Sequence, residues 1–403
     1  MKTSGVGRAR RIAGVALIAA SVLLASGCGH GSKPSWQGGG SQAGGANAPS
    51  STPTPSTVAV VSPAANATGV VAVSPVKYTS EDPENTTVTV AGPDGTQIPG
   101  TVDKDAKTWT PSTALAYGTK YTVTVTGTAS AGKGGTTTST FTTMAKPANV
   151  VRATSFLGDD QTVGVAMPLI VKFSRSIPVS YRDEVERRMT VTATPAQVGT
   201  WHWISATEVH YRPEVYWKAD SKVYYKVALA GVPLGGGYYG KSDMTVDINI
   251  GRSFIMTVSN KTKRMTVTEN GKVIKTLPVS LGKPSTPSSS GTMVVIQKLR
   301  HTVFDTTDTD PTGGYKVPID YAQRITWSGQ FIHAAPWSEG KQGKVNVSHG
   351  CVNVSEAMGA WLFGQTMMGD PITVSGTGQP LLNGNGWTDW NMSYDEYKKG
   401  SYL

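Results

Sequence analysis

Cys351 and two histidines are the residues of this sequence whose types and spacing could do chemistry. Cys351 lies two residues after His349 and eighteen residues after His333, and the only other cysteine is Cys28. An ordinary thiol is mostly protonated at neutral pH, so it becomes a good nucleophile only when a neighbouring base takes its proton. A histidine can be that base and can later give the proton to a leaving amine. The group therefore indicates nucleophilic catalysis by a cysteine.

His333 is the better candidate for the base. Residues two apart in an extended segment share a face, so His349 is also a candidate, but it is close to Cys351 in sequence. His333 ends a separate predicted strand, and the connection to Cys351 is long enough to fold it back onto the thiol. Gly350 lets the backbone turn, so that successive N–H groups can point at a developing oxyanion.

Cys351 has two simpler explanations. A lone cysteine is often a small buried hydrophobic residue, but its neighbours Ser348, His349, Gly350 and Asn353 are polar or glycine. A zinc site needs three or four ligands at a recognisable spacing, and no Cys-x-x-Cys or His-Glu-x-x-His pattern is present. Zinc therefore remains only an alternative, and the expectation is that the protein uses neither a metal nor another cofactor.

The elements that must position these residues lie in a mostly β region from 251 to 377. Asn270-Gly271, between alternating residues, is the strongest short signal for a β-hairpin. We expect further strands at Gly291–Gln297, Arg324–Gly329, Gln330–Ala335 and Asp370–Gly376. We expect one helix at Ser355–Met367, which Ser355 can cap. The segment from 301 to 324 has little strand pattern and contains glycines, which is typical of a lid loop.

Two similar regions, 58–146 and 147–250, precede the catalytic region. "VKY" at Val76–Tyr78 recurs as "VKF" at Val171–Phe173, 95 residues later. Two regions of this length with many short strands predict tandem immunoglobulin-like sandwiches, with a spacer role. Residues 378–403 are rich in Trp and Tyr, and we expect this tail to pack on the folded domains.

The N-terminus has the composition of an export signal. Residues 1–27 contain four basic residues and an apolar run, Ile12–Ala25, that is too short to span a bilayer comfortably. The run leads to "ASGC", ending at Cys28, which resembles a bacterial lipobox; an ordinary cleaved signal is the alternative. Residues 28–57 are rich in Gly, Ser and Pro, which predicts a flexible linker. We expect an exported protein, lipid-anchored at the cell membrane and facing the wall or periplasmic space.

The net charge is modest and diffuse. It is +10, and falls to +6 without the four basic residues of the signal region. No dense Lys/Arg stripe is present, so nucleic acid is not an expected partner, whereas an anionic cell envelope fits. The low charged fraction, 16%, and the abundance of Thr and Val favour β structure over helix bundles.

The stretch "HAAPW…SHGCVN", His333–Asn353, closely resembles the signature of bacterial L,D-transpeptidases of the mycobacterial type, in which a His precedes a Ser/Thr-His-Gly-Cys-x-Asn motif. The order of two immunoglobulin-like domains, a catalytic domain and a Trp-rich tail is also similar to that family. The resemblance implies a mainly β chain. It would have two immunoglobulin-like sandwiches, a mostly β L,D-transpeptidase catalytic domain with a short helix, and the Trp-rich tail.

The resemblance also implies roles for individual residues. Cys351 would be the nucleophile and His333 the general base and acid. Several relatives have Ser where this chain has Ala334, so a group that orients His333 would be a backbone carbonyl. Oxyanion N–H groups would come from His349, Gly350 and Cys351, with Ser348 and Asn353 shaping the loop. Substrate contacts would be Tyr315, Ser328, Gly329 and Asn353.

The implied reaction is acyl transfer on peptidoglycan. Cys351 would attack the third residue of a tetrapeptide stem and release D-Ala. A side-chain amine of a second stem would then resolve the thioester into a 3→3 cross-link. Carbapenems would acylate the same sulfur. The alternatives are an L,D-carboxypeptidase, in which water resolves the thioester, and a non-catalytic stalk that binds the wall.

Overall fold

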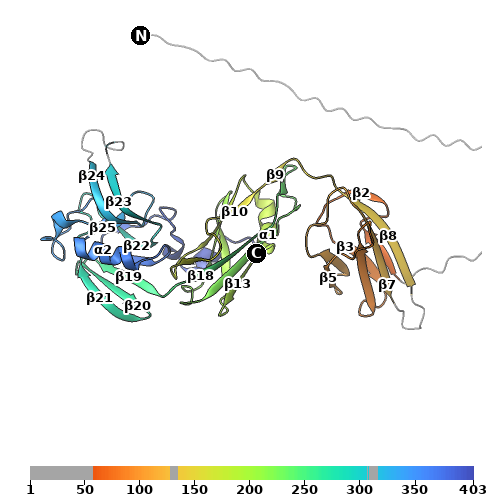
Figure 1. Cartoon of the computed structure of the whole chain (residues 1–403), viewed down its shortest axis with the longest axis horizontal. Coiled ribbons are helices and arrows are strands. Elements are labelled where there is room, and N and C mark those ends of the chain that lie inside the picture. The colour runs from red at the N-terminus through yellow and green to blue at the C-terminus, as the bar shows by residue number, and fades with distance from the viewer. Residues whose placement is uncertain (1–57, 128–134, 306, 308–315) are drawn as a thin grey trace, which may run out of the picture. The chain divides into compact units, whose positions relative to one another are not determined.

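The protein is described by a computed structural model that covers residues 58–127, 135–305, 307 and 316–403. Cys28, Tyr315, the signal region and the whole linker, 28–57, lie outside the described residues. Strands dominate the described chain, together with three short α-helices (Figure 1). None of the described helices is long and apolar enough to cross a membrane.

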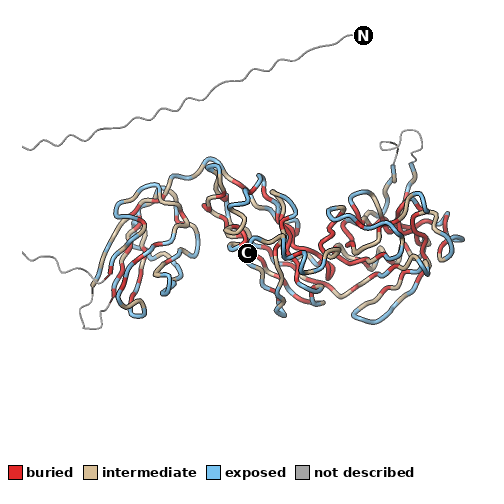
Figure 2. The backbone as a smooth tube through the Cα atoms, turned by 180° about the vertical axis from the view of Figure 1, so that it is seen from behind, coloured by how far each residue is buried: buried red, intermediate tan, exposed pale blue. Residues whose placement is uncertain are grey.

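The first immunoglobulin-like domain consists of two four-stranded sheets. One has the order β1 (Val58–Ser62), β3 (Val76–Ser80), β6 (Thr108–Pro111), β5 (Gly100–Asp103). The other has the order β2 (Ala67–Val70), β8 (Gly135–Thr143), β7 (Lys120–Gly127), β4 (Thr86–Ala91). Buried and less buried residues alternate along β7, with Tyr121, Val123 and Val125 inside (Figure 2). Successive strand side chains point to opposite faces, so this alternation puts one face of the sheet in the core.

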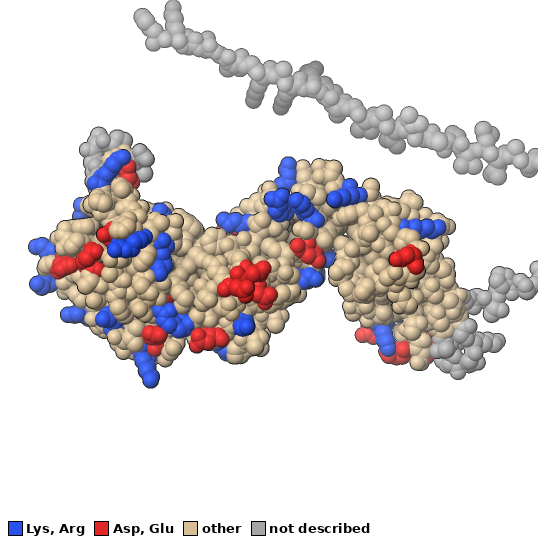
Figure 3. All heavy atoms as spheres, viewed as in Figure 1, with Lys and Arg blue, Asp and Glu red and all other residues tan. Residues whose placement is uncertain are grey.

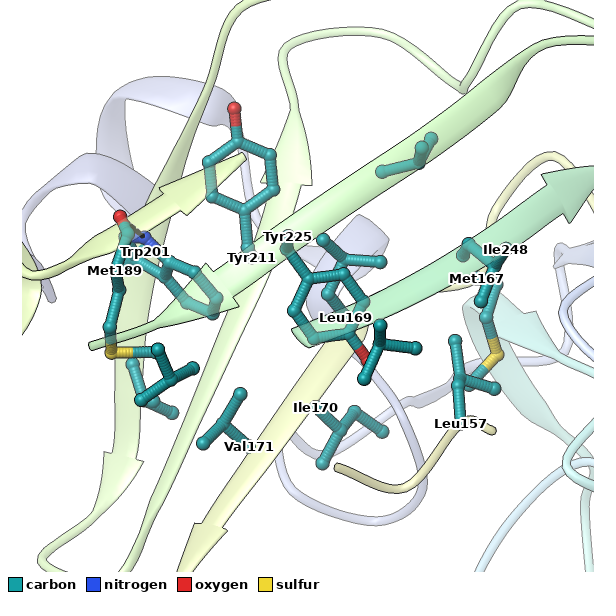
Figure 4. Packing of buried hydrophobic residues seen from close by; sticks show 14 of the residues in the cluster. Leu157, Met167, Leu169, Ile170, Val171, Met189, Trp201, Tyr211, Tyr225 and Ile248 are labelled. Atoms are coloured by element: carbon teal, nitrogen blue, oxygen red, sulfur yellow. Dashed lines mark hydrogen bonds between the residues drawn. The ribbon is translucent and has the colours of Figure 1, made fainter. Parts of the chain in front are cut away.

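The second domain repeats this plan. Its sheets have the orders β10 (Ala153–Ser155), β12 (Leu169–Phe173), β15 (Glu208–Pro213), β14 (Gly199–Ser205), and β11 (Gln161–Val163), β18 (Met244–Ile250), β16 (Lys222–Val227), β13 (Met189–Thr194). A small pair, β9 (Val150–Val151) and β17 (Tyr239–Gly240), and a helix, α1 (Val179–Arg187), complete it. Leu169, Tyr225 and Ile248 come from three different strands and meet in its core (Figure 4).

The catalytic region contains a six-stranded and a four-stranded sheet. The first has the order β21 (Lys272–Pro278), β20 (Arg264–Glu269), β19 (Phe254–Ser259), β27 (Pro371–Ser375), β22 (Ser289–Val294), β28 (Gln379–Pro380). The second has the order β23 (Gln297–Asp305), β24 (Lys316–Arg324), β25 (Phe331–Ala334), β26 (Val352–Val354). A single 3-10 turn, η1 (Pro336–Ser338), and a helix, α2 (Glu356–Gln365), lie beside the second sheet.

Two local signals in this region act as expected. Asn270 and Gly271 join β20 to β21 with φ values of 48° and 78°, the left-handed conformation that a two-residue hairpin turn requires. The Ser355 side chain accepts a hydrogen bond from the N–H of Met358 and caps α2.

Two expectations for this region are wrong. Ile325–Gly329 is a turn rather than a strand: the N–H of Ile325 donates to the carbonyl of Gln330 at 2.9 Å, and Gly329 has φ 91°. The segment from 301 to 324 was expected to be a loop, yet its ends lie in β23 and β24, which pair as an antiparallel hairpin. Alternation over four to six residues does not separate a strand from a tight turn.

The C-terminal tail contains η2 (Asp389–Asn391) and α3 (Tyr394–Lys398) and packs on the second domain. The indole N–H of Trp390 donates to the carbonyl of Ala166 at 2.7 Å. Asp389 Oδ1 lies 2.9 Å from Nδ1 of His210 on β15 and accepts a hydrogen bond from the Tyr397 hydroxyl. Glu208 contacts the other ring nitrogen of His210 at 2.9 Å. The tail is thus tied to the second domain by a buried polar cluster.

The fold class predicted from the sequence is confirmed: immunoglobulin-like sandwiches precede a mostly β catalytic region with one short helix. On the face drawn in Figure 3, Lys and Arg are interspersed with Asp and Glu, and the described part of that face has no continuous basic band.

Candidate active site

The pairing of β25 with β26 brings three predicted site residues together. The two strands are parallel, and His333 is opposite Asn353. Cys351 lies two residues before Asn353, so the two side chains share a face of the extended segment. All three line one pocket of about 430 Å³. The separation of eighteen residues in sequence is closed by the register of two neighbouring strands.

His333 is held in one orientation by its own backbone. Its side chain is buried, and Nδ1 lies 2.7 Å from the carbonyl oxygen of Ala334. Because a carbonyl only accepts hydrogen bonds, Nδ1 carries the proton and Nε2 is left as the basic atom. Burial lowers the pKa of His333, against the opposing effects of the Ala334 carbonyl and the Asn353 amide. The ring is therefore neutral at pH 7.

The thiol of Cys351 is neutral as well. It is 6% exposed, in a small apolar cluster with Ile319, Ala322 and Phe331. Burial raises the pKa of the thiol to about 12, although the backbone N–H of Phe331 acts in the opposite direction. Its Sγ donates a weak hydrogen bond to the carbonyl of Gly329 at 3.8 Å. The pocket thus contains a neutral thiol and a neutral imidazole.

The loop before Cys351 is fixed by Ser348. The Ser348 hydroxyl donates to the Cys351 carbonyl at 2.7 Å and accepts from the N–H of Gly350 at 3.1 Å. The Gly350 N–H therefore already has an acceptor. The N–H group of Cys351 is the better candidate for binding an oxyanion.

The ring of His349 lies at the rim of the pocket. Nε2 is 3.0 Å from Nζ of Lys283, so the ammonium group donates to it. Partial burial and the Lys283 charge both lower the pKa of His349. With its Nε2 lone pair bonded to Lys283, this ring is a poor second base for Cys351.

Asn353 also faces the pocket. Its Nδ2 donates to the Ser338 hydroxyl at 3.4 Å. Its Oδ1 is buried and has no hydrogen-bond partner within the described residues. A buried amide oxygen without a partner costs free energy, and a substrate N–H in the pocket could satisfy it.

Ser328 and Gly329 lie in the turn that reaches the thiol. The Gly329 carbonyl accepts the hydrogen bond of the Cys351 thiol, and neither Ser328 nor Gly329 is among the residues that line the pocket. The tail holds this turn: Asn385 accepts from the Ser328 N–H at 2.8 Å and donates to the Ser328 hydroxyl at 2.9 Å. Asn385 was not anticipated from the sequence, and no local pattern marks it.

No group of three or more His, Cys, Asp or Glu side chains that could hold a metal ion occurs within the described ranges. Cys351 is the free cysteine of that part of the chain.

Comparison with known families agrees with this geometry. Residues 253–374 match the family described as L,D-transpeptidase catalytic domain, and residues 67–233 match the family described as bacterial Ig domain. L,D-transpeptidase 2 of Mycobacterium tuberculosis (strain CDC 1551 / Oshkosh) is 34% identical over 342 residues, which are 83% of this chain and 82% of that protein. The chain belongs to the L,D-transpeptidase family.

Two further L,D-transpeptidases are similar to this chain over different lengths. L,D-transpeptidase 5 of Mycobacterium tuberculosis (strain ATCC 25618 / H37Rv) is 32% identical, over 85% of this chain and 76% of that protein. Among solved structures, LD transpeptidase LdtMt1 in complex with imipenem is 32% identical and matches 57% of this chain and 100% of its own, with a TM-score of 0.48.

The pocket of this L,D-transpeptidase has walls that sequence reasoning did not name. Apolar side chains of the β23–β24 hairpin form one wall, and Trp337, 59% exposed, stands at the mouth beside His333. The wall residues are Phe304, Val317 and Ile319. The alternation of Val317 and Ile319 was the available signal, because residues two apart on a strand face the same side.

Proposed function

We propose that this L,D-transpeptidase joins peptidoglycan stems by 3→3 cross-links through a thioester at Cys351. The observation that carries the proposal is the shared pocket of Cys351, His333 and Asn353, with His333 oriented by the Ala334 carbonyl so that Nε2 is its basic atom. A cysteine, a base and a fixed orienting group are what nucleophilic acyl transfer requires.

In the first half-reaction the sulfur attacks the carbonyl of the third stem residue. The bond from Sγ to carbon forms while the thiol proton passes to Nε2 of His333. The C–N bond to D-Ala then breaks, and His333 returns the proton to the leaving amine. In the second half-reaction the side-chain amine of another stem attacks the thioester, gives its proton to His333 and releases the thiol. A strained β-lactam carbonyl of the carbapenem type would acylate the same sulfur.

The buried neutral pair fits this sequence of steps. A neutral imidazole can accept the thiol proton. The buried thiol can give it up during the attack, because the negative charge then passes from sulfur to the carbonyl oxygen of the substrate. Asn353 Oδ1, which lacks a partner within the described chain, would accept an N–H of the bound stem. The substrate roles of Tyr315, Ser328 and Gly329 remain predictions from the family resemblance.

The test is mass spectrometry of the purified enzyme with a tetrapeptide stem whose third residue is a diamino acid. The expected results are a Cys351 adduct, with loss of D-Ala, and a cross-linked dimer. Cys351→Ala should give neither. A tripeptide product without any dimer would make the protein an L,D-carboxypeptidase. An adduct or dimer formed equally by Cys351→Ala would overturn the assignment of the nucleophile.

Location is part of the proposal. The apolar run before Cys28 supports export and a lipid anchor, and the linker would then let the folded domains reach into the wall from the membrane.

A further inference from the structure

Ser288 contacts the nucleophile loop from behind. It is 1% exposed and does not line the pocket. Its hydroxyl donates to the carbonyl of Gly350 at 2.7 Å and accepts from the N–H of Gly282 at 2.9 Å. Ser288 is 62 residues from Gly350 in sequence. A buried hydroxyl with both a donor and an acceptor on backbone atoms is held in one place.

The hydrogen bond from Ser288 to the Gly350 carbonyl also fixes the direction of the Cys351 N–H. A trans peptide is planar, and its C=O and N–H point in opposite directions. The Gly350 carbonyl belongs to the same peptide group as the Cys351 N–H. Since that carbonyl points to Ser288, the Cys351 N–H points away from Ser288. Cys351 lines the pocket and Ser288 does not, so this direction is toward the side where substrate would lie.

The peptide group needs such a restraint because it follows a glycine. Gly350 has φ 121°, a conformation that residues with a side chain rarely adopt. Glycine gives the adjoining peptide group rotational freedom that Ser288 removes. The segment carrying Ser288 is itself fixed, because the Gln330 amide accepts from the Ser289 N–H and donates to the Ser289 hydroxyl, each at 3.0 Å.

We propose that Ser288 is a positioning residue that orients the Cys351 N–H to bind the oxyanion formed during acylation. The inference rests on the proposed function. When the Sγ–carbon bond forms, the carbonyl π pair moves onto oxygen and the thiol proton moves to His333. A donor already aimed at that oxygen stabilises the charge without reorganising during the reaction.

The experiment compares two reactions at the same sulfur. Acylation by meropenem passes through an oxyanion, whereas alkylation by iodoacetamide displaces iodide from carbon and forms none. Intact mass and peptide mapping at Cys351 give both rates. Ser288→Ala should lower the acylation rate about tenfold or more, less than the roughly 10²–10³-fold cost of removing a whole oxyanion donor. It should leave the alkylation rate within about twofold of the wild type.

Two controls separate orientation from damage. Thr and Val have nearly the same shape, but only Thr keeps the hydroxyl. Ser288→Thr should therefore retain the acylation rate, and Ser288→Val should lose it. Ser290→Ala removes a hydroxyl two residues further along, on β22, that bonds to Thr377 instead, and it should leave both rates unchanged.

Each result has a defined meaning. Equal acylation rates for the wild type and Ser288→Ala, or for Ser288→Thr and Ser288→Val, would overturn the proposal that Ser288 orients the Cys351 N–H. So does an equal loss of acylation and alkylation, which would indicate a merely structural residue. A wild type that is alkylated but never acylated would instead contradict the proposed function.

Discussion

At the scale of single residues, the proposed nucleophile and the proposed base are both neutral. Burial raises the pKa of Cys351 to about 12 and lowers that of His333. A thiolate–imidazolium pair would need the two pKa values in the opposite order. We therefore expect slow oxidation and alkylation of the resting thiol, because the thiolate is the reactive form of cysteine.

Alkylation of Cys351 should have an unusual pH dependence. With a folded pKa near 12, the thiolate fraction, and so the rate with iodoacetamide, should rise about tenfold per pH unit from pH 7 to 10. The measurement uses the Cys28→Ala chain, so that one thiol remains. The same chain unfolded in urea is the control and should level off near pH 8.5–9, where ordinary thiols titrate. A plateau there in the folded chain would contradict the buried thiol.

The two histidines should differ in importance. His333→Ala should abolish cross-linking, because Nε2 of His333 is the proposed base and lies in the same pocket as the thiol. His349→Ala should lose less activity, since its ring bonds to Lys283 and its backbone N–H is retained. Initial rates of dimer formation for both variants test this. Equal residual rates would remove the distinction between the two residues.

At the scale of elements, the C-terminal tail depends on a buried ionic cluster. Burial by itself would lower the pKa of His210, but the carboxylates of Asp389 and Glu208 outweigh it and raise the pKa to about 9. Both ring nitrogens face carboxylates, so His210 is a cation at neutral pH. A folded pKa above the unfolded value near 6.5 stabilises the docked tail fully below pH 6.5, and this stabilisation is lost as pH rises through 9.

The thermal midpoint should record this loss. We expect the wild type to lose thermal stability between pH 6.5 and pH 9.5, and His210→Gln to show a lower midpoint that changes less over that range. His301→Gln, an exposed histidine on β23, is the matched control and should follow the wild type. Identical pH profiles of the thermal midpoint for wild type and His210→Gln would show that a charged His210 does not stabilise the docked tail.

At the scale of the whole molecule, the proposed anchor explains why a catalytic region follows a linker and two immunoglobulin-like domains. Stems in a wall lie away from the membrane, so an enzyme tied to the bilayer needs chain that reaches them. The Gly/Ser/Pro-rich composition of 28–57 predicts such a connecting chain.

Palmitate labelling tests the anchor directly. Cells that express the wild type should incorporate labelled palmitate into the protein and retain it in the membrane fraction. Cys28→Ala should incorporate none, because the thiol that carries the lipid is gone. Cys351→Ala is the matched control and should be labelled like the wild type. Equal labelling of Cys28→Ala and wild type would make the N-terminus an ordinary secretion signal.

The sequence by itself determined what local chemistry decides. Asn270-Gly271 made its hairpin and Ser355 capped its helix, because the turn conformation and the capping hydrogen bond involve only neighbouring residues. The types and spacing of Cys351 and His333 were enough to predict a nucleophile and a base, and the structure places both in one pocket. Along Lys120–Gly127 the alternation of residue types coincides with the alternation of buried and less buried positions.

Only the tertiary structure decided which distant atoms meet. Ile325–Gly329 has the pattern of a strand, but a backbone hydrogen bond from Ile325 to Gln330 makes it a turn. The Gly329 carbonyl of this turn contacts the thiol of Cys351. The contacts of Ser288 with Gly350 and of Asn385 with Ser328 join residues 62 and 57 positions apart. Burial, pKa and hydrogen-bond direction depend on such partners across strands, and no spacing along the chain specifies them.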